Sequence, residues 1–202
     1  WELTWEFNDA PRVPWLLSVE TLDASTPAAA SGGHDAGSLS PPRVEHPAFA
    51  RYRPQLDALA AQQEKDLGDR IVVRKNADYV SRRYLQHPLE RYTLLFVKHR
   101  ITRKLLGLCV LKAEAERVLW MDAIAPHAHL PALAQVARAE AWKLQHRKLA
   151  LWCCEPDVTR FGAVNTATAL PITTPANVWS PGPKPEELKD RWWLLAGDTD
   201  WL

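Results

Sequence analysis

Three strand-like runs follow one another in the middle of the chain, and they constrain its fold more than any other feature. The runs are YTLLFVKH at 92–99, KLLGLCVLKA at 104–113 and RVLWMDAIA at 117–125, and the stretches between them are short and charged. Strands connected this tightly lie side by side and run in opposite directions. We therefore predict an antiparallel meander.

The pattern changes after the meander. Apolar side chains recur at spacings of three and four from Leu130 to Leu144, with Pro131 near the start, which predicts an amphipathic helix. The run KLALWCC at 148–154 has the length of a strand that is buried on both faces. A strand, a helix and a strand after a meander indicate a crossover. The prediction is a mixed sheet in an α/β (α+β) fold.

The remaining elements complete this layout. The spacing of apolar residues predicts a helix over 47–67 that ends at Gly68, and a second helix over 77–86. The second ends before His87-Pro88, because proline disfavours helical backbone in the residue before it. We also expect strands or extended segments at 71–74, 169–179 and 191–197, and a short helix at 157–166.

Residues 24–43 divide the chain. Ala, Ser, Gly and Pro dominate this stretch, with Leu39 its one large apolar residue over 24–42, so we predict a flexible linker. The Trp-rich segment 1–23 is too short for a core of its own. We expect it to cover the main body or to be the remnant or docking segment of an upstream domain, which the start at Trp1 favours. We expect residues 44–202 to form the main domain.

Composition excludes several classes of protein. The 202 residues include 25 basic and 24 acidic side chains, for a formal charge of +1, which gives no reason to expect binding to nucleic acid or to an anionic membrane. No apolar stretch approaches the 18 or so residues of a membrane span. Three cysteines are too few for a disulfide framework, so we expect a cytoplasmic location.

Three motifs indicate a family. They are RRYLQHPLERY at 82–92, LWMDAIA at 119–125 and WWLLAGDTDWL at 192–202. With these motifs, residues 44–202 resemble the GNAT superfamily of N-acetyltransferases, in particular a group of bacterial GNAT-like domains. The resemblance implies a GNAT-like mixed, mostly antiparallel sheet flanked by helices. It also implies acetyl-CoA-dependent acyl transfer to an amine or hydroxyl acceptor.

The resemblance also places the cofactor. In catalytic GNAT domains, backbone N–H groups of a glycine-containing loop and the next helix N-terminus hold the pyrophosphate of acetyl-CoA. The matching residues here, expected to bind the cofactor, are Ile124, Ala125, His127, Ala128, His129 and Leu130. The loop has no glycine, and Pro126 and Pro131 remove two N–H donors, so it is a degenerate version of the pattern.

Asp122 is the most informative candidate for catalysis. Strand alternation places it on one face with Val118, Trp120 and Ile124. A carboxylate in that setting is desolvated, which suits a general base that takes a proton from an amine. The alternative is that Asp122 accepts hydrogen bonds from the backbone or from an arginine and only holds the strand in place.

Further candidates lie on either side of the meander. The resemblance places Tyr84 and His87 near the acceptor side of the cleft, where they would shape a pocket or donate a proton. The alternative is a tyrosine packed beneath the sheet and a histidine that caps a turn. Trp192, Asp198 and Asp200 are candidates for acceptor binding, with core packing and strand capping as alternatives.

Other chemistry finds less support. His127 and His129 have the residue type of zinc ligands but lack a convincingly spaced third ligand, so we predict no metal. Cys153 and Cys154 point to opposite faces of a strand and fit core packing. Basic residues near Lys98–Lys104 would attract an anionic group. The alternative is that they only form a solvent-exposed hairpin tip.

Two hypotheses remain open. In the first, the chain is a GNAT-type acyltransferase, with a sheet that splays beside Asp122 to admit the thioester. In the second, it is a non-catalytic GNAT-like lobe that serves acceptor binding or domain interaction in a larger enzyme. The expected partners are a small-molecule amine or sugar-like acceptor and an upstream domain or a homodimer mate, with no nucleic acid and no membrane.

Overall fold

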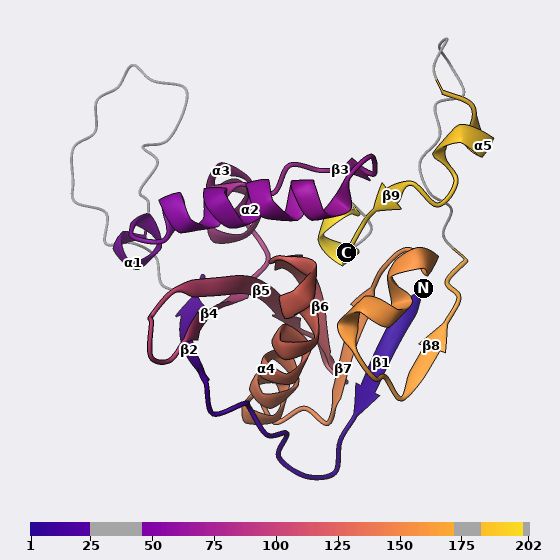
Figure 1. Ribbon diagram of the computed structural model, residues 1–202. Coiled ribbons are helices and arrows are strands. Elements are labelled where there is room, and N and C mark those ends of the chain that lie inside the picture. Colours follow the sequence, from indigo (N-terminus) through magenta and orange to yellow (C-terminus); the bar gives the residue numbers. More distant parts are fainter. Residues whose placement is uncertain (25–45, 172–182, 200–202) are drawn as a thin grey trace.

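The computed structural model describes residues 1–24, 46–171 and 183–199, and its centre is an open seven-stranded sheet (Figure 1). The strands lie in the order β2-β4-β5-β6-β7-β1-β8. Their bounds are β1 Glu2–Glu6, β2 Leu17–Asp23, β4 Thr93–His99, β5 Leu105–Ala113, β6 Val118–Ile124, β7 Lys148–Trp152 and β8 Thr166–Thr168. Neighbouring strands are antiparallel except β6 and β7. The predicted mixed, mostly antiparallel sheet of an α+β fold is confirmed.

Strands β4, β5 and β6 form the predicted meander. Thr93 of β4 pairs with Leu111 of β5, and Leu108 of β5 pairs with Ile124 of β6. Each strand begins and ends within one residue of its predicted run. All residues of β6 are buried, which fits its position inside the sheet.

The crossover after the meander is also confirmed. Helix α4 (Leu130–Lys143) joins β6 to β7, and the two strands are parallel. Their paired stretch ends at Trp120 and Leu151, whereas β6 continues to Ile124. The last part of β6 therefore extends beyond its pairing with β7.

A bulge in β6 changes which face Asp122 occupies. The pairing with β5 shifts at Met121, which falls between the paired residues Trp120 and Asp122. An extra residue reverses the alternation of side chains beyond it. Val118 and Trp120 pack in the core beneath α4, whereas Ile124 packs in the core on the opposite face. The expectation that Asp122 shares a face with Val118 and Trp120 is therefore wrong.

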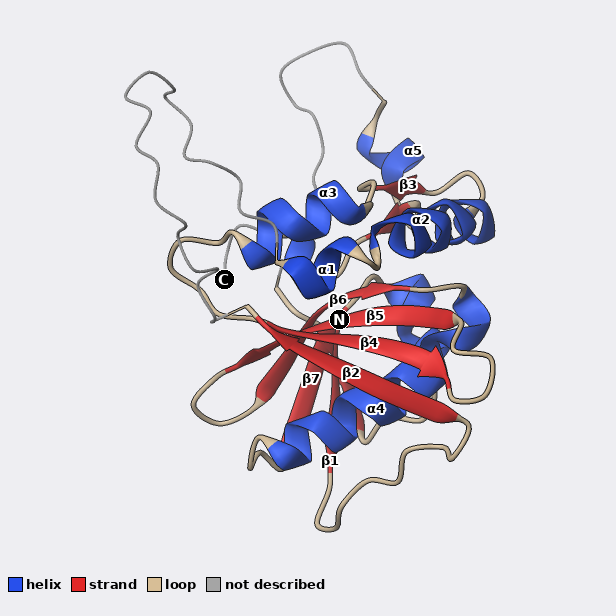
Figure 2. Ribbon diagram, turned by 90° about the vertical axis from the view of Figure 1, so that its left-hand side faces the viewer, coloured by secondary structure: helices blue, strands red, loops and turns tan. Residues whose placement is uncertain are grey.

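Helices cover both faces of the sheet (Figures 1 and 2). Leu133 and Val136 of α4 belong to one apolar cluster, and Leu56 and Val80 belong to the other. The elements on this second face are α1 (Pro47–Ala50), α2 (Arg53–Leu67), α3 (Ala77–Val80) and the π-helical turn η1 (Ser81–Leu85). Among the described residues, no helix combines the length and apolar character that crossing a bilayer requires.

The helix predicted over 47–67 is interrupted after Ala50. Pro54 lacks an N–H group and its ring would clash with the carbonyl of Ala50, so α2 begins separately at Arg53. Gly68 ends α2 as predicted, with a φ of 64°. The helix predicted over 77–86 consists of α3 followed by η1.

The N-terminal segment is part of the main sheet. Strand β1 lies between β7 and β8, and β2 pairs with β4 at one edge. Trp5 is buried, and its indole N–H donates to the carbonyl oxygen of Ala163 at 2.7 Å. From residue 25 on, the predicted linker lies outside the described residues.

The C-terminal part differs most from expectation. A two-stranded parallel sheet pairs β3 (Ile71–Val72) with β9 (Trp192–Trp193), so the strands predicted over 71–74 and 191–197 are too long. The structure also contains short helical elements, which are η2 (His127–His129), η3 (Glu155–Phe161), α5 (Pro185–Leu188) and η4 (Ala196–Asp198). The extended segment predicted at 169–179 lies outside the described residues from 172 on.

Candidate functional site

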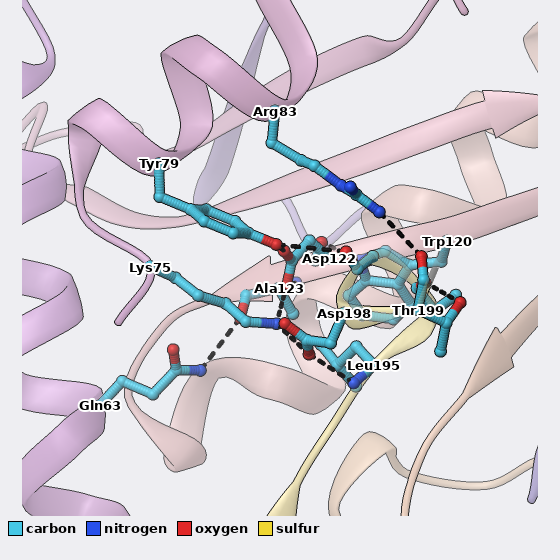
Figure 3. Close-up of polar contacts among 12 residues, drawn as sticks. Gln63, Lys75, Tyr79, Arg83, Trp120, Asp122, Ala123, Leu195, Asp198 and Thr199 are labelled. Carbon is cyan, nitrogen blue, oxygen red and sulfur yellow. Dashed lines mark hydrogen bonds and ion pairs between the residues drawn. The ribbon is translucent and has the colours of Figure 1, made fainter. Parts of the chain in front are cut away.

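A buried polar cluster surrounds Asp122 beyond the bulge in β6 (Figure 3). Lys75 comes from the segment between β3 and α3, Tyr79 from α3, Tyr84 from η1 and Asp198 from η4. We call these five residues the Asp122 cluster. It joins the meander, the helices of one face and the C-terminal segment.

Both carboxylate oxygens of Asp122 are occupied. Oδ1 lies 2.6 Å from Lys75 Nζ, and it also accepts the backbone N–H of Ala123 at 3.1 Å. Oδ2 accepts the hydroxyl of Tyr84 at 2.7 Å and that of Tyr79 at 3.2 Å. The side chain of Asp122 is fully buried, so these protein groups replace its hydration.

Lys75 connects Asp122 to the C-terminal segment. Its Nζ also lies 2.6 Å from Asp198 Oδ2, which accepts the backbone N–H of Leu195 at 2.8 Å. Burial lowers the pKa of Lys75, but the two carboxylates outweigh burial and raise it above the ordinary value. Burial raises the pKa of Asp198, although Lys75 opposes the shift.

The two tyrosines act as donors in this cluster. Burial and the charge of Asp122 raise the pKa of Tyr79 and the pKa of Tyr84 well above their ordinary value. Their hydroxyls are therefore protonated at neutral pH and donate to Asp122. The ammonium of Lys75 therefore contacts both carboxylates, and the two hydroxyls add hydrogen bonds to that of Asp122.

Backbone contacts fix β6 around the cluster. The indole N–H of Trp120 donates to the carbonyl oxygen of Asp122 at 2.7 Å. The amide of Gln63 in α2 donates to the carbonyl oxygen of Ala123 at 3.0 Å. These bonds satisfy two carbonyl groups in the part of β6 that extends beyond its pairing with β7, and they stabilise it.

The C-terminal segment packs directly against this end of β6. A Cβ atom placed on Gly197 would lie 2.0 Å from the hydroxyl of Tyr84 and 3.0 Å from the carbonyl oxygen of Met121. Leu195 forms an antiparallel bridge with Cys153, just beyond β7. Residues 195–198 therefore lie beside the part of β6 that has separated from β7, where the open-sheet hypothesis places a thioester.

The structure brings three predicted site residues together and separates others. Asp122, Tyr84 and Asp198 meet in the cluster. The Nδ1 of His87 accepts the backbone N–H of Glu90 at 2.8 Å, as in the turn-capping alternative. Trp192 lies in β9, where its carbonyl oxygen accepts a hydrogen bond from Arg70, and Asp200 lies outside the described residues. Catalytic and acceptor-binding roles for these residues stay predictions.

The predicted cofactor loop leaves few N–H donors. The N–H of His127 donates to Asp66 Oδ2 at 3.0 Å, and the N–H of His129 donates to the carbonyl oxygen of Pro126 at 2.9 Å. The N–H of Leu130 donates to the carbonyl oxygen of His127. Of the other loop residues, Ile124 and Ala125 are fully buried and Ala128 is exposed.

The side chains of this loop are also engaged. His127 Nδ1 lies 2.9 Å from Arg160 Nη1, and the His127 ring lies 5.5 Å from that of Trp193. Burial first, and then Arg160, lower the pKa of His127. Burial and Lys104 lower the pKa of His129. Both rings are therefore neutral at pH 7 and add no positive charge for a phosphate.

Sequence reasoning missed Lys75 and Tyr79. Lys75 follows Arg74 in the run IVVRKNADYV, and nothing in the local pattern distinguishes the two cations. The Lys75 side chain is nevertheless 2 % exposed, whereas that of Arg74 is 75 % exposed. The local signal near these two residues is Asn76, a residue type that favours the start of a helix. Its side chain accepts the N–H of Tyr79 at the start of α3.

No family model matches the chain, and searches of curated proteins and of solved structures gave no match either. The architecture itself is established as a mixed α+β fold with a seven-stranded, mostly antiparallel sheet. The resemblance to GNAT domains stays an expectation from the three sequence motifs.

Proposed function

We propose that this chain is a GNAT-like lobe of an acyltransferase, which serves acceptor binding or domain interaction and does not itself hold acetyl-CoA. One observation carries the proposal. Asp66 Oδ2 accepts the N–H of His127, at the start of the loop that binds the cofactor pyrophosphate in catalytic GNAT domains. Because Asp66 places a negative charge there, it competes with a phosphate for the same donor.

The pKa of Asp66 supports this argument. Burial acts to raise it, but hydrogen bonds from Gln62 and from the backbone of His127 outweigh burial and lower it. Asp66 is therefore ionised throughout the neutral range. Pro126 and Pro131 contribute no N–H, and those of His129 and Leu130 are bonded within the loop, so few donors are left to replace that of His127.

The Asp122 cluster supports the same proposal. A general base needs a free oxygen within reach of the acceptor, and both oxygens of Asp122 are already bonded within the protein. Lys75 also balances the charge of Asp122. In this role, Asp122 holds β6, η1 and η4 together.

The three free cysteines fit the proposed cytoplasmic location.

Calorimetric titration of the purified chain with acetyl-CoA tests the proposal. We expect no binding up to millimolar cofactor. Micromolar binding that is lost in His129→Asp, which adds a carboxylate at the start of α4, would overturn it. His146→Asp places the same change just past the other end of α4 and serves as the matched control.

A second candidate function is acyl transfer by this chain to an amine or hydroxyl acceptor. It is favoured by the extension of β6 beyond its pairing with β7, with Asp122 in the extension. For Asp122 to accept a proton, Lys75 or a tyrosine hydroxyl has to move away from it. The test is turnover of acetyl-CoA by Asp122→Asn. Loss of turnover in a folded variant supports catalysis, and turnover near that of the original chain excludes Asp122 as the base.

A further inference from the structure

The entry to β2 and the turn between β4 and β5 form one surface. The N–H of Arg100 donates to the carbonyl oxygen of Leu16 at 2.6 Å, and the guanidinium of Arg100 donates to the carbonyl oxygen of Leu17. Trp15 and Ile101 are the chain neighbours of these bonded residues. Figure 2 shows the start of β2 and the β4–β5 turn together at the right-hand end of the sheet.

Large apolar side chains are exposed on this surface. Trp15 is 68 % exposed, Ile101 is 69 % exposed and Leu16 is 36 % exposed. They are three of the five large apolar side chains that are exposed among the described residues. Arg100, Arg103 and Lys104 are exposed beside them. We call these six residues the basic tip.

The two segments that meet at this surface carry charges of one sign. Residues 10–19 and 97–104 contain no Asp or Glu, but they contain Arg12, Lys98, Arg100, Arg103 and Lys104. Since the whole chain has a formal charge of +1, these five cations leave a formal charge of −4 on the rest. Lys98 is paired internally with Glu20. The near-neutral total therefore conceals a local concentration of positive charge.

The turn that carries Ile101 is held in place by its own hydrogen bonds. His99 Nδ1 accepts the N–H of Thr102 at 3.2 Å, and the carbonyl oxygen of His99 accepts the N–H of Arg103 at 2.8 Å. Arg103 adopts a φ of 59°, which reverses the chain toward β5. Because the turn is already ordered, binding through it loses little conformational entropy.

We propose that the basic tip docks this protein onto an anionic lipid bilayer. Trp15 and Ile101 enter the headgroup region, and Arg100, Arg103 and Lys104 face the lipid phosphates. Trp is one of the two side chains enriched at membrane interfaces, and each basic residue near an anionic surface raises the affinity by roughly fivefold. A peptide ligand fits less well, because peptide recognition uses a groove or a free strand edge, and the tip is a projecting turn.

The inference does not depend on the proposed function, because the basic tip shares no residue with the predicted cofactor loop or with the Asp122 cluster. It differs from the expectation of no membrane partner, which was based on total charge. Docking at this end also leaves the Asp122 cluster untouched. A failure of the acetyl-CoA test therefore does not affect the membrane test, and the reverse also holds.

Co-sedimentation with lipid vesicles tests the proposal. We expect binding to phosphatidylcholine vesicles that contain about 30 % phosphatidylserine, and at least about tenfold weaker binding to pure phosphatidylcholine. Binding should weaken as salt rises, because salt screens exposed charges. Equal affinity for the two vesicles, or no binding to either, overturns the proposal.

Variants locate the contact. Trp15→Ser and Ile101→Ser each should lower the affinity by about fivefold to tenfold, and Arg103→Glu by about 25-fold, because it removes a positive charge and adds a negative one. Leu89→Ser removes an 86 % exposed apolar side chain near the opposite end of β4, and Arg82→Glu reverses an exposed charge on η1. Both controls should bind as the original chain does. Equal losses in controls and tip variants, or a dimer in sedimentation velocity that Trp15→Ser dissociates, exclude lipid docking by the tip.

Discussion

Lys75 Nζ lies 2.6 Å from Asp122 Oδ1, although the two residues are 47 positions apart in the chain. The same ammonium lies 2.6 Å from Asp198 Oδ2, which is 123 positions from Lys75. One buried cation therefore ties the centre of the sheet to the C-terminal segment. Because each charge in the cluster is compensated only when all three are in place, the cluster couples the position of η4 to that of β6.

Removing the ammonium should destabilise the fold strongly. In Lys75→Met, the two carboxylates stay buried without a compensating cation. Breaking a buried ion pair in this way costs about 3–5 kcal/mol. The free energy of unfolding, measured by urea denaturation, should fall by about this amount.

Arg74→Met is the matched control for this change. It removes the neighbouring cation, whose contact with Glu64 is a surface pair at 3.5 Å. Such a pair contributes about 0–1 kcal/mol. Equal losses of stability in the two variants would show that the Asp122 cluster contributes no more than a surface ion pair.

Alkaline pH should weaken the fold through the same cluster. The carboxylates raise the pKa of Lys75 above 10.5 despite its burial, and burial raises the pKa of Tyr84 well above 10.0. A group with a raised folded-state pKa gives its full stabilisation below the unfolded-state pKa. This stabilisation is lost as pH rises toward the folded-state value, because the unfolded chain releases the proton first.

The free energy of unfolding should therefore fall above about pH 10, by up to about 1.4 kcal/mol per pH unit for each group. Urea denaturation between about pH 8 and 11 measures this slope. Tyr84→Phe removes one titrating hydroxyl and should make the slope shallower. An unchanged slope in this variant would contradict the role assigned to Tyr84.

The sequence predicted the layout of the sheet well because the relevant signals are local. The meander follows from short connections, and the β6–α4–β7 crossover follows from a change of apolar period after Pro126. Asp122 was predictable as a site because it is the one charged residue in the apolar run 118–125. Its partner Lys75 was not, because the contact joins distant segments. The bulge at Met121 has no glycine or proline signal, so the face of Asp122 was predicted wrongly.

Trp5 should contribute much more to stability than Trp15. Trp5 is 1 % exposed between β7 and β8 and contacts the ring of Trp120, with 6.4 Å between ring centroids. Trp5→Ala should cost about 3–5 kcal/mol of unfolding free energy, because it leaves a large cavity. Trp15→Ala should change it by less than about 0.5 kcal/mol, because that side chain is exposed. Similar costs at both positions would contradict the packing of β1 within the main sheet.

The close approach of Gly197 to Tyr84 is testable by a double-mutant cycle. In Gly197→Ala, the new methyl group would lie 2.0 Å from the hydroxyl of Tyr84, so η4 or η1 has to shift. We expect a loss of about 1–3 kcal/mol in unfolding free energy. Tyr84→Phe removes the hydroxyl, so Gly197→Ala should cost less in that background, by on the order of 1 kcal/mol. Met121 still limits the rescue, because its carbonyl oxygen lies 3.0 Å from the added Cβ. Strictly additive losses would mean that the C-terminal segment does not pack against Tyr84 in solution.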